Sequence, residues 1–530
     1  MKQIIKLFIP LLLIFTSIGC KKSYDDLYKN NNTPTSVPPY LLLRGIENDI
    51  VEEPFSYKEI WNQYFLYDYD YYGNNRYDFG EGDNYYNTLK NVARMEEEAK
   101  NTGLPDVNVY GALAKFFKAY LFTRMSLQQG DIPVTQALQG IDNLSPTYDS
   151  QKQVFLQAFS WLDSANTELT QLIAAKDNNL QGDFYFKEQA TGGMSAVAAM
   201  QKWQKVVNAV RLRLLINLSK KADDPDINLR QQFSAILGDK SKYPVMESAD
   251  DDLKYIYINP TNKYPNNPGN FGFDAGRHVS SKTYIGLLTS LHDPRVFVTA
   301  DPADSLVRKG NSPTSFEAFA GADPGEDLGN MYKEATLGLY SGLNRKRFYD
   351  TYTGEPSIQV GYAEMCFTIA EAINRGFVTG DGETYYRQGI LTSMASYGIP
   401  QSGPFNVYFL HPGASLGSYD TYTVNSDFEN YYGQPDVKYA GNNATGLTEI
   451  LQQKYLALFR HAGLESYYQF RRTGVPQFTT GPGTGNSNRI ALRFKYPNSE
   501  LTANPDNYQA ALQSQYGGND DINGTMWLLK

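Results

Sequence analysis

The sequence predicts a mainly α-helical protein in which stacked helices form a scaffold and loop-rich insertions carry a few short strands. Three long segments, 106–129, 149–175 and 203–221, place apolar residues at helical spacing. Two other stretches, 239–357 and 398–445, are rich in Gly, Pro, Asn and Tyr, and helical periodicity fades in them. Successive amphipathic helices joined by short turns are typical of a stacked helical scaffold.

The segment 106–129 illustrates the helical pattern. Val109, Leu113 and Phe117 lie on one face of it, and Gly130 ends it. Further helices are expected at 39–52, 55–66, 84–100, 358–376, 382–397 and 446–471. Because long loops without their own structure are uncommon in compact domains, we expect the two loop-rich stretches to rest on the helices and to contain short strands.

The first 19 residues predict a secretory signal peptide. Lys2 and Lys6 precede the apolar run 7–15, which is too short to cross a bilayer. Small residues then lead to Cys20, so we expect cleavage before this cysteine and lipid attachment to it. The alternative is an ordinary signal peptide with a chance cysteine. Lipid on Cys20 would anchor the chain to a membrane surface.

The remaining chain is interpreted as a lipidated tether followed by one domain. The polar segment 20–36 is the tether, and residues 37–530 form the domain. We divide this domain into a helical scaffold (37–238), a loop-rich insertion (239–357), returning helices (358–397 and 446–471), a second loop-rich stretch (398–445) and a C-terminal segment (472–530).

Cysteine count and charge narrow the functional classes. The second of the two cysteines, Cys366, falls in an apolar helical pattern and is expected in the core. The formal net charge of −9, with both signs interspersed, argues against nucleic acid as a partner.

Motifs for catalysis and cofactors are weak or missing in the sequence. The four histidines form no HExxH pair, and no P-loop occurs, so we expect no metal, cofactor or catalytic residue. Residues 413–417 match GxSxG around Ser415, but a nucleophile elbow needs a following helix, and 418–427 is not helical in pattern. Residues 519–530 imitate a calcium loop, yet Lys530 stands where a bidentate Glu is needed. A surface hydrolase is the unfavoured alternative, and no local pattern of acidic residues supports glycosidase chemistry.

Tyrosine is over-represented, with 41 residues, and is densest in the segment 64–79. A tyrosine ring has an apolar face and a polar rim, which suits stacking on a sugar ring or covering a peptide backbone. The candidate ligand-binding residues are Tyr67, Tyr69, Tyr71, Tyr72, Asn75, Arg76, Tyr77, Tyr257 and Tyr422. The alternative for each ring is a place in the core or as a loop anchor.

Short motifs spread along residues 20–530 carry a family resemblance when taken in order. They are Lys118-Ala119-Tyr120-Leu121, Gly130-Asp131-Ile132-Pro133, Trp203-Gln204-Lys205, Asp293-Pro294-Arg295, Ala370-Glu371-Ala372, Gln453 to Phe459 and Arg471 to Pro476. Together they resemble the SusD/RagB-like outer-membrane lipoproteins of Bacteroidetes, especially the SusD-like 2 branch.

The resemblance implies tetratricopeptide-like helix pairs and a protein that lacks catalytic residues. Such proteins cap a TonB-dependent, SusC-like transporter as a hinged lid, facing the cell exterior. It also implies that Asp293-Pro294-Arg295 is a turn with its arginine tied to backbone, and that the segment 471–474 ends a helix. We therefore expect a lipid-anchored protein that captures oligosaccharides. Capture of oligopeptides is the alternative within the same architecture.

Overall fold

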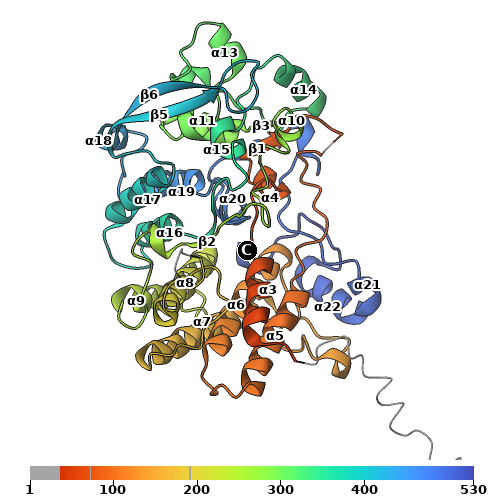
Figure 1. The fold of residues 1–530 in the computed structure, drawn as a ribbon. Coiled ribbons are helices and arrows are strands. Elements are labelled where there is room, and N and C mark those ends of the chain that lie inside the picture. The colour runs from red at the N-terminus through yellow and green to blue at the C-terminus, as the bar shows by residue number, and fades with distance from the viewer. Residues whose placement is uncertain (1–35, 72, 190–192) are drawn as a thin grey trace, which may run out of the picture.

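The helices form two stacked groups, and the loop-rich elements lie together at one end of them (Figure 1). This computed structural model describes residues 36–71, 73–189 and 193–530, so the predicted signal peptide, Cys20 and the candidate Tyr72 lie outside the described residues. The predicted class, mainly α with short strands in the loop-rich parts, is confirmed. Within the described ranges, no helix has the length and apolar character needed to cross a membrane.

The first group consists of helices that pack on one another in chain order, at the bottom of Figure 1. They are α3 (Pro39–Asp49), α5 (Tyr86–Asn101), α6 (Val109–Gln129), α7 (Gln151–Ala174), α8 (Ala196–Asn217) and α9 (Leu229–Gly238). Local sequence sets their starts, because the side chains of Asn108, Ser150 and Ser195 each accept a backbone N–H of the helix that follows.

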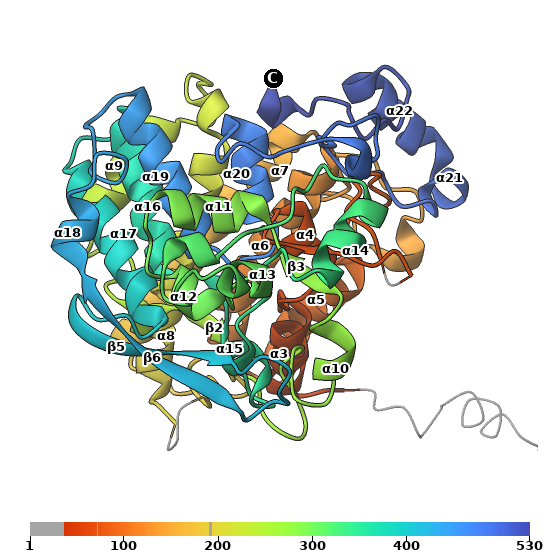
Figure 2. The same ribbon diagram turned by 90° about the horizontal axis from the view of Figure 1, so that it is seen from above.

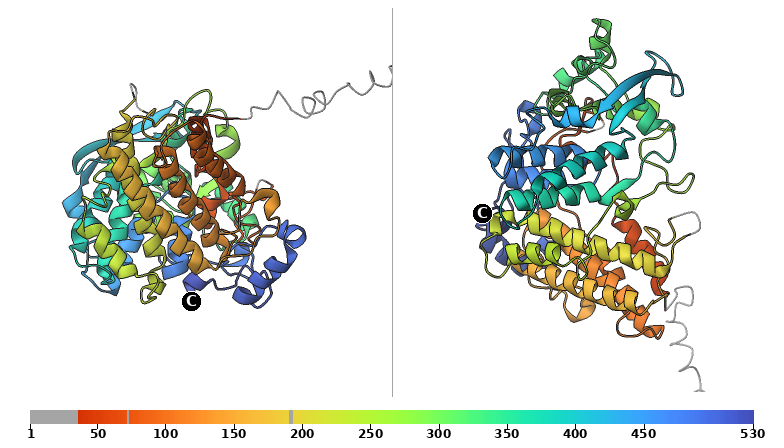
Figure 3. Two further views of the ribbon diagram at one scale, coloured as in Figure 1. Left: turned by 90° about the horizontal axis from the view of Figure 1, so that it is seen from below. Right: turned by 90° about the vertical axis from the view of Figure 1, so that its left-hand side faces the viewer.

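The second group stacks on the first, as the right-hand view of Figure 3 shows. Its members are α16 (Tyr362–Asn374), α17 (Gly382–Ser396), α19 (Ala444–Ala457) and α20 (Glu465–Thr473). Helix α16 contacts α17 and α19 within the group and α8 of the first group. Cys366 is buried in α16, as the sequence predicts.

The described residues form three two-stranded antiparallel sheets. They pair β1 (Phe65–Tyr67) with β3 (His278–Ser280), β2 (Leu253–Tyr255) with β4 (Ser357–Val360), and β5 (Ser402–Leu410) with β6 (Tyr419–Asp427). The β2–β4 sheet lies between the two helical groups, and β1–β3 and β5–β6 lie at the loop-rich end (Figure 1). Short helices fill the space between them: α10 (Phe271–Asp274), α11 (Lys282–Ser290), α12 (Val296–Thr299), α13 (Asp304–Arg308), α14 (Leu328–Thr336), α15 (Arg345–Tyr349) and α18 (Phe428–Tyr432). Figure 2 looks down on this end and shows the β5–β6 hairpin beside α12 and α15.

The predicted and the observed helices show three main differences. The segment 55–66 holds only α4 (Tyr57–Trp61) before the chain enters β1, because residues 65–67 pair with β3 far along the chain. The predicted helix 446–471 is two helices, since Arg460, Ala462 and Gly463 all have positive φ angles between α19 and α20.

The third difference lies in the C-terminal segment, where helical periodicity predicted nothing. It contains α21 (Glu500–Ala503) and α22 (Pro505–Tyr516), which lie beside the first helical group at the right of Figure 1.

Two family motifs make contacts that support the fold. Gly474 ends α20 in the left-handed conformation, so the predicted helix cap is confirmed. The prediction for Arg295 was wrong in one respect, because its guanidinium binds side chains instead of backbone. It donates to Asp293 Oδ1 (2.9 Å), Ser393 Oγ (2.9 Å) and Gln453 Oε1 (2.6 Å), and so joins α17 and α19. A fully buried guanidinium needs such partners.

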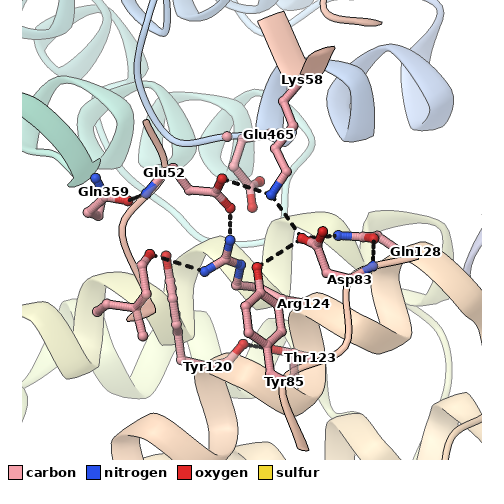
Figure 4. Close-up of polar contacts among 12 residues, drawn as sticks. Glu52, Lys58, Asp83, Tyr85, Tyr120, Thr123, Arg124, Gln128, Gln359 and Glu465 are labelled. Atoms are coloured by element: carbon pink, nitrogen blue, oxygen red, sulfur yellow. Dashed lines mark hydrogen bonds and ion pairs between the residues drawn. The ribbon is translucent and has the colours of Figure 1, made fainter. Parts of the chain in front are cut away.

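A polar network lies at the boundary between the two helical groups (Figure 4). Lys58 Nζ lies 2.8 Å from both Glu52 Oε2 and Asp83 Oδ2. Arg124 of α6 pairs with the other oxygen of Glu52, and Gln128 Nε2 donates to Asp83 Oδ2 at 2.9 Å. These contacts connect α4 to α6 and to the segment before α5.

Candidate ligand-binding site

A pocket of about 390 Å³ opens at the loop-rich end, among β3, α13, α14 and the β5–β6 hairpin. Aromatic side chains line it from three elements: Tyr332 from α14, Phe409 from β5 and Tyr422 from β6. Tyr340, from the loop after α14, adds a fourth ring. A concave site with several aromatic rings and a few polar groups is the usual form of a small-ligand site.

The β5–β6 hairpin forms one wall of the pocket, and buried and exposed side chains alternate along β5. Val407 and Phe409 are buried while Tyr408 between them is exposed, because successive side chains of a strand point to opposite faces. Tyr422 pairs with Val407 in the ladder, and its ring centroid lies 5.7 Å from that of Phe409. Asn344 Nδ2 donates to the Tyr408 carbonyl at 2.9 Å and holds the hairpin against α15.

The inner end of the pocket is built on the β1–β3 pair. Tyr67 lies opposite His278 in this ladder, with 4.6 Å between ring centroids, and Phe55 packs on the same histidine at 4.5 Å. Burial lowers the pKa of His278 to about 4, so the ring is neutral at physiological pH. Asp68, the residue after β1, also lines the pocket, and burial raises its pKa to about 6.

A set of partly exposed rings adjoins the pocket and is called the tyrosine face below; it consists of Tyr69, Tyr71 and Tyr332. The Tyr69 centroid lies 5.2 Å from that of Tyr332 and 6.4 Å from that of Tyr71. Tyr71 is 78% exposed and Tyr332 is 44% exposed, so both rings can be reached from solvent. Because Tyr332 also lines the pocket, the face and the pocket form one continuous surface.

Three of the candidate residues instead make internal contacts. Tyr77 is buried and its hydroxyl donates to the Trp61 carbonyl at 2.8 Å. Tyr257 is buried, with its hydroxyl 2.8 Å from Ser357 Oγ. Asn75 is buried and bonds both the N–H and the carbonyl of Tyr67, so it shapes the tyrosine segment from within. None of these three side chains lines the pocket.

Arg76, a fourth candidate, is exposed and pairs with Asp78 at 2.5 Å. Of the candidate residues, Tyr67, Tyr69, Tyr71 and Tyr422 lie at the same end of the molecule as the pocket. The guanidinium of Arg76 is bound by Asp78.

Several pocket residues were not predicted from the sequence. Tyr332 and Phe409 stand outside the dense tyrosine clusters, and His278 shows no motif. Only the pairing of β1 with β3 and the position of α14 bring these residues to the 67–71 segment.

The GxSxG match at Ser415 is the turn of the β5–β6 hairpin. The chain continues into β6, so the strand-to-helix geometry of a nucleophile elbow does not occur there. His411 Nδ1 lies 3.1 Å from Asp420 Oδ2 across the hairpin. No cluster of three or more side chains suited to holding a metal ion occurs in the parts of the chain that the structure describes.

Comparison with protein families matches residues 31–497 to SusD-like 2, which is described as "Starch-binding associating with outer membrane". Comparison with curated proteins finds no match.

Solved structures also resemble the chain over nearly its whole length. A SusD homolog from Bacteroides fragilis is 30% identical, with coverage of 93% of this chain and 100% of that one and a TM-score of 0.78. A second SusD homolog from the same species is 28% identical, with the same coverage and a TM-score of 0.76. A chitin-binding SusD homolog from Flavobacterium johnsoniae is 20% identical, covers 93% of this chain and 98% of its own, and has a TM-score of 0.67; this last likeness concerns the fold alone.

Proposed function

This chain belongs to the SusD-like 2 family, and we propose that it is a binding protein that captures an oligosaccharide at the outer membrane. The observation that carries the proposal is the continuous surface formed by the tyrosine face and the pocket. Exposed Tyr71 and Tyr332 offer flat apolar faces, and the pocket beside them holds carboxylate, imidazole and guanidinium groups.

The chemistry of a sugar ring fits such a surface. One side of the ring presents C–H groups that stack on an aromatic face, and its edge presents hydroxyls that need directional hydrogen bonds. Tyr69 packs on Tyr332 and thereby fixes the orientation of the ring that borders the pocket. A surface held in place before binding loses little conformational freedom when the ligand arrives.

The chitin-binding homolog from Flavobacterium johnsoniae supports a saccharide ligand for this fold. Its ligand is a property of that protein, and the identity of 20% is too low to carry the sugar over. The proposal for this chain is therefore oligosaccharide capture without a named sugar. The alternative is capture of oligopeptides on the same rings, and a titration with both kinds of ligand distinguishes the two.

We further propose a lipid anchor on Cys20, exposure to the cell exterior and delivery of the ligand to a SusC-like TonB-dependent transporter. The sequence before Cys20 supports the anchor, and the family's association with the outer membrane supports the location. The transporter follows from the family resemblance. We also propose that the chain binds without turnover, since the Ser415 motif is a hairpin turn.

Calorimetric titration of the mature chain in detergent tests the proposal. Neutral oligosaccharides of starch, cellulose and chitin type and tetrapeptides of mixed composition serve as ligands, and the products are examined by mass spectrometry. Binding of at least one oligosaccharide without cleavage is the expected result. Binding of peptides alone, or saccharide cleavage that is lost in Ser415→Ala, would contradict it.

A further inference from the structure

The pocket beside the tyrosine face has hydrogen-bonding groups whose character indicates the class of ligand that it accepts. Two buried atoms of pocket-lining residues, His278 Nε2 and Asp68 Oδ1, have no hydrogen-bond partner among the described residues. His278 is 5% exposed and Asp68 is 4% exposed. Both atoms are themselves shielded from solvent, so they set the electrostatic character of the inner wall of the pocket.

The tautomer of His278 defines what its free nitrogen can do. Nδ1 lies 2.8 Å from the carbonyl oxygen of Asp274, and a carbonyl oxygen only accepts hydrogen bonds. Nδ1 therefore carries the proton, and Nε2 of the neutral ring is an acceptor. A carboxylate oxygen such as Oδ1 of Asp68 is an acceptor as well. At these two positions the inner wall of the pocket thus presents hydrogen-bond acceptors and no donor for an anionic group.

Charge on the pocket wall points the same way. Four aspartates line the pocket, and two of them, Asp304 and Asp420, are within reach of solvent. Nearby, the Tyr340 hydroxyl contacts the carboxylates of both Glu326 and Glu334. A concentration of carboxylates in a concave site attracts cations and repels anions.

The two arginines of the pocket already have backbone acceptors. Arg345 donates to the carbonyls of Leu343 (2.6 Å) and Ala275 (2.8 Å), and Arg308 donates to the carbonyl of Leu337 (2.9 Å). Arg345 is thereby held by the protein, whereas Arg308 is exposed and lies one helical turn from Asp304 in α13. Burial raises the pKa of Asp301 to about 7, so this aspartate is partly protonated at neutral pH. The other three aspartates of the pocket still outnumber the two arginines.

We infer that this pocket selects saccharides by charge: it takes oligosaccharides that present hydroxyl or ammonium donors and rejects those that carry carboxylates or sulfates, with Asp304 and Asp420 as the specificity-determining residues. This inference rests on the proposed function. It adds a substrate class, non-acidic glycans, to a site for which aromatic rings alone would not distinguish neutral from acidic sugars.

The test compares sugars that differ only in charge, using the mature chain in detergent. Cellohexaose and maltohexaose are each paired with their C6-oxidised, carboxylate-bearing forms, and the glucosamine hexamer supplies the ammonium form of the cellulose-type backbone. For the neutral hexamer that binds, we expect an affinity about tenfold or more higher than that of its oxidised form at low salt. The difference should shrink at 0.5 M NaCl, because salt screens exposed charges beyond a few ångströms. The glucosamine hexamer shows whether the pocket recognises ammonium groups or hydroxyl groups. Only the affinity for ammonium groups should fall steeply as the salt concentration rises.

The double variant Asp304→Asn and Asp420→Asn tests the assignment to residues. We expect the ratio of neutral to oxidised hexamer affinity to fall by about fivefold or more relative to wild type. The control, Asp223→Asn with Glu247→Gln, removes the same charge from side chains that are 90% and 80% exposed and do not line the pocket. It should leave the selectivity as in wild type.

The outcomes distinguish this inference from the proposed function. Binding of an oxidised hexamer as tightly as its neutral form overturns charge selection and leaves saccharide capture standing. Rejection of acidic sugars that persists in the pocket variant, or that is lost equally in the control, overturns the role of Asp304 and Asp420. If no saccharide of any class binds, the proposed function itself fails and the inference falls with it.

Discussion

The ring of Tyr69 lies 5.2 Å from the ring of Tyr332, centroid to centroid, and this contact joins the tyrosine-rich segment after β1 to the pocket beside α14. A single ring does not make an extended binding surface. Tyr69 comes from the irregular segment after β1, and Tyr332 comes from the short helix α14. Their contact makes a continuous surface from two segments that are far apart in the sequence.

The double substitution Tyr69→Ala and Tyr332→Ala should weaken oligosaccharide binding by about 1–3 kcal/mol, which is the usual contribution of aromatic anchors. Because Tyr332 is 44% exposed and Tyr69 is not part of the core, the melting temperature should stay close to that of wild type. Calorimetric titration and thermal unfolding measure the two effects.

Tyr408→Ala is the matched control for this prediction, since Tyr408 is a partly exposed tyrosine on the face of β5 that points away from Phe409. The affinity of the Tyr408→Ala variant for the oligosaccharide should equal that of wild type. Equal weakening in both variants, or none in Tyr69→Ala with Tyr332→Ala, would place the ligand elsewhere.

Lys58 connects two carboxylates in the network of Figure 4, and its loss should destabilise the junction of the helical groups. Lys58→Met leaves Asp83 and one oxygen of Glu52 without their cation in a partly buried place. We expect a decrease of about 1–3 kcal/mol in the free energy of unfolding, measured by urea denaturation at pH 7. Lys90→Met, at an exposed lysine that bonds only Asn87, should change the stability by less than about 0.5 kcal/mol.

Much of the helical scaffold could be predicted from the sequence, because amphipathic periodicity and capping residues are local signals. The segment 106–129 is helical from Val109 to Gln129, with Asn108 as its cap, and the loop-rich stretches do carry short strands. The break between α19 and α20 was missed, since its cause is the backbone conformation of Arg460 and Ala462, which have no obvious sequence signature.

The candidate site could be predicted only in part, for a physical reason. Dense aromatics mark Tyr67, Tyr69 and Tyr71 as unusual, but the same composition also describes Tyr77, which the fold buries. Whether a ring faces solvent depends on tertiary contacts, such as the pairing of β1 with β3. His278 becomes part of the pocket through that pairing alone.

Lipidation is predicted at Cys20, which lies outside the described residues. Cells that express the wild-type chain and are fed an alkyne analogue of palmitate should yield a labelled protein in the membrane fraction. Cys20→Ser should lose the label and leave the membrane fraction, because a lipid chain provides the apolar contact with the bilayer. Cys366→Ser, at a buried cysteine of α16, is the control and should keep the label; a labelled Cys20→Ser chain would refute the anchor.

Glu371 of α16 and Arg472 of α20 form a buried pair, with Nη2 of the arginine 2.9 Å from Oε2 of the glutamate. Arg472→Met would leave this carboxylate in the interior with Arg375 and the charge of Lys454 as its remaining cations. Breaking a buried pair by removing one partner typically costs about 3–5 kcal/mol of stability. We expect a loss of this size in urea unfolding at pH 7, and a smaller one for Arg375→Met, whose guanidinium is partly exposed.

The same pair predicts how acid affects the stability. Burial by itself would raise the pKa of Glu371, but the charge and hydrogen bonds of Arg472 outweigh it and lower this pKa from 4.5 to about 2. A carboxyl group with a lower pKa in the folded state contributes its full stability above pH 4.5 and loses it as the pH falls toward 2. In Arg472→Met that contribution is already lost, so the gap in unfolding free energy between wild type and variant should narrow from pH 7 to pH 3. A gap that stays constant over this range would show that the arginine acts through packing instead of through the charge of Glu371.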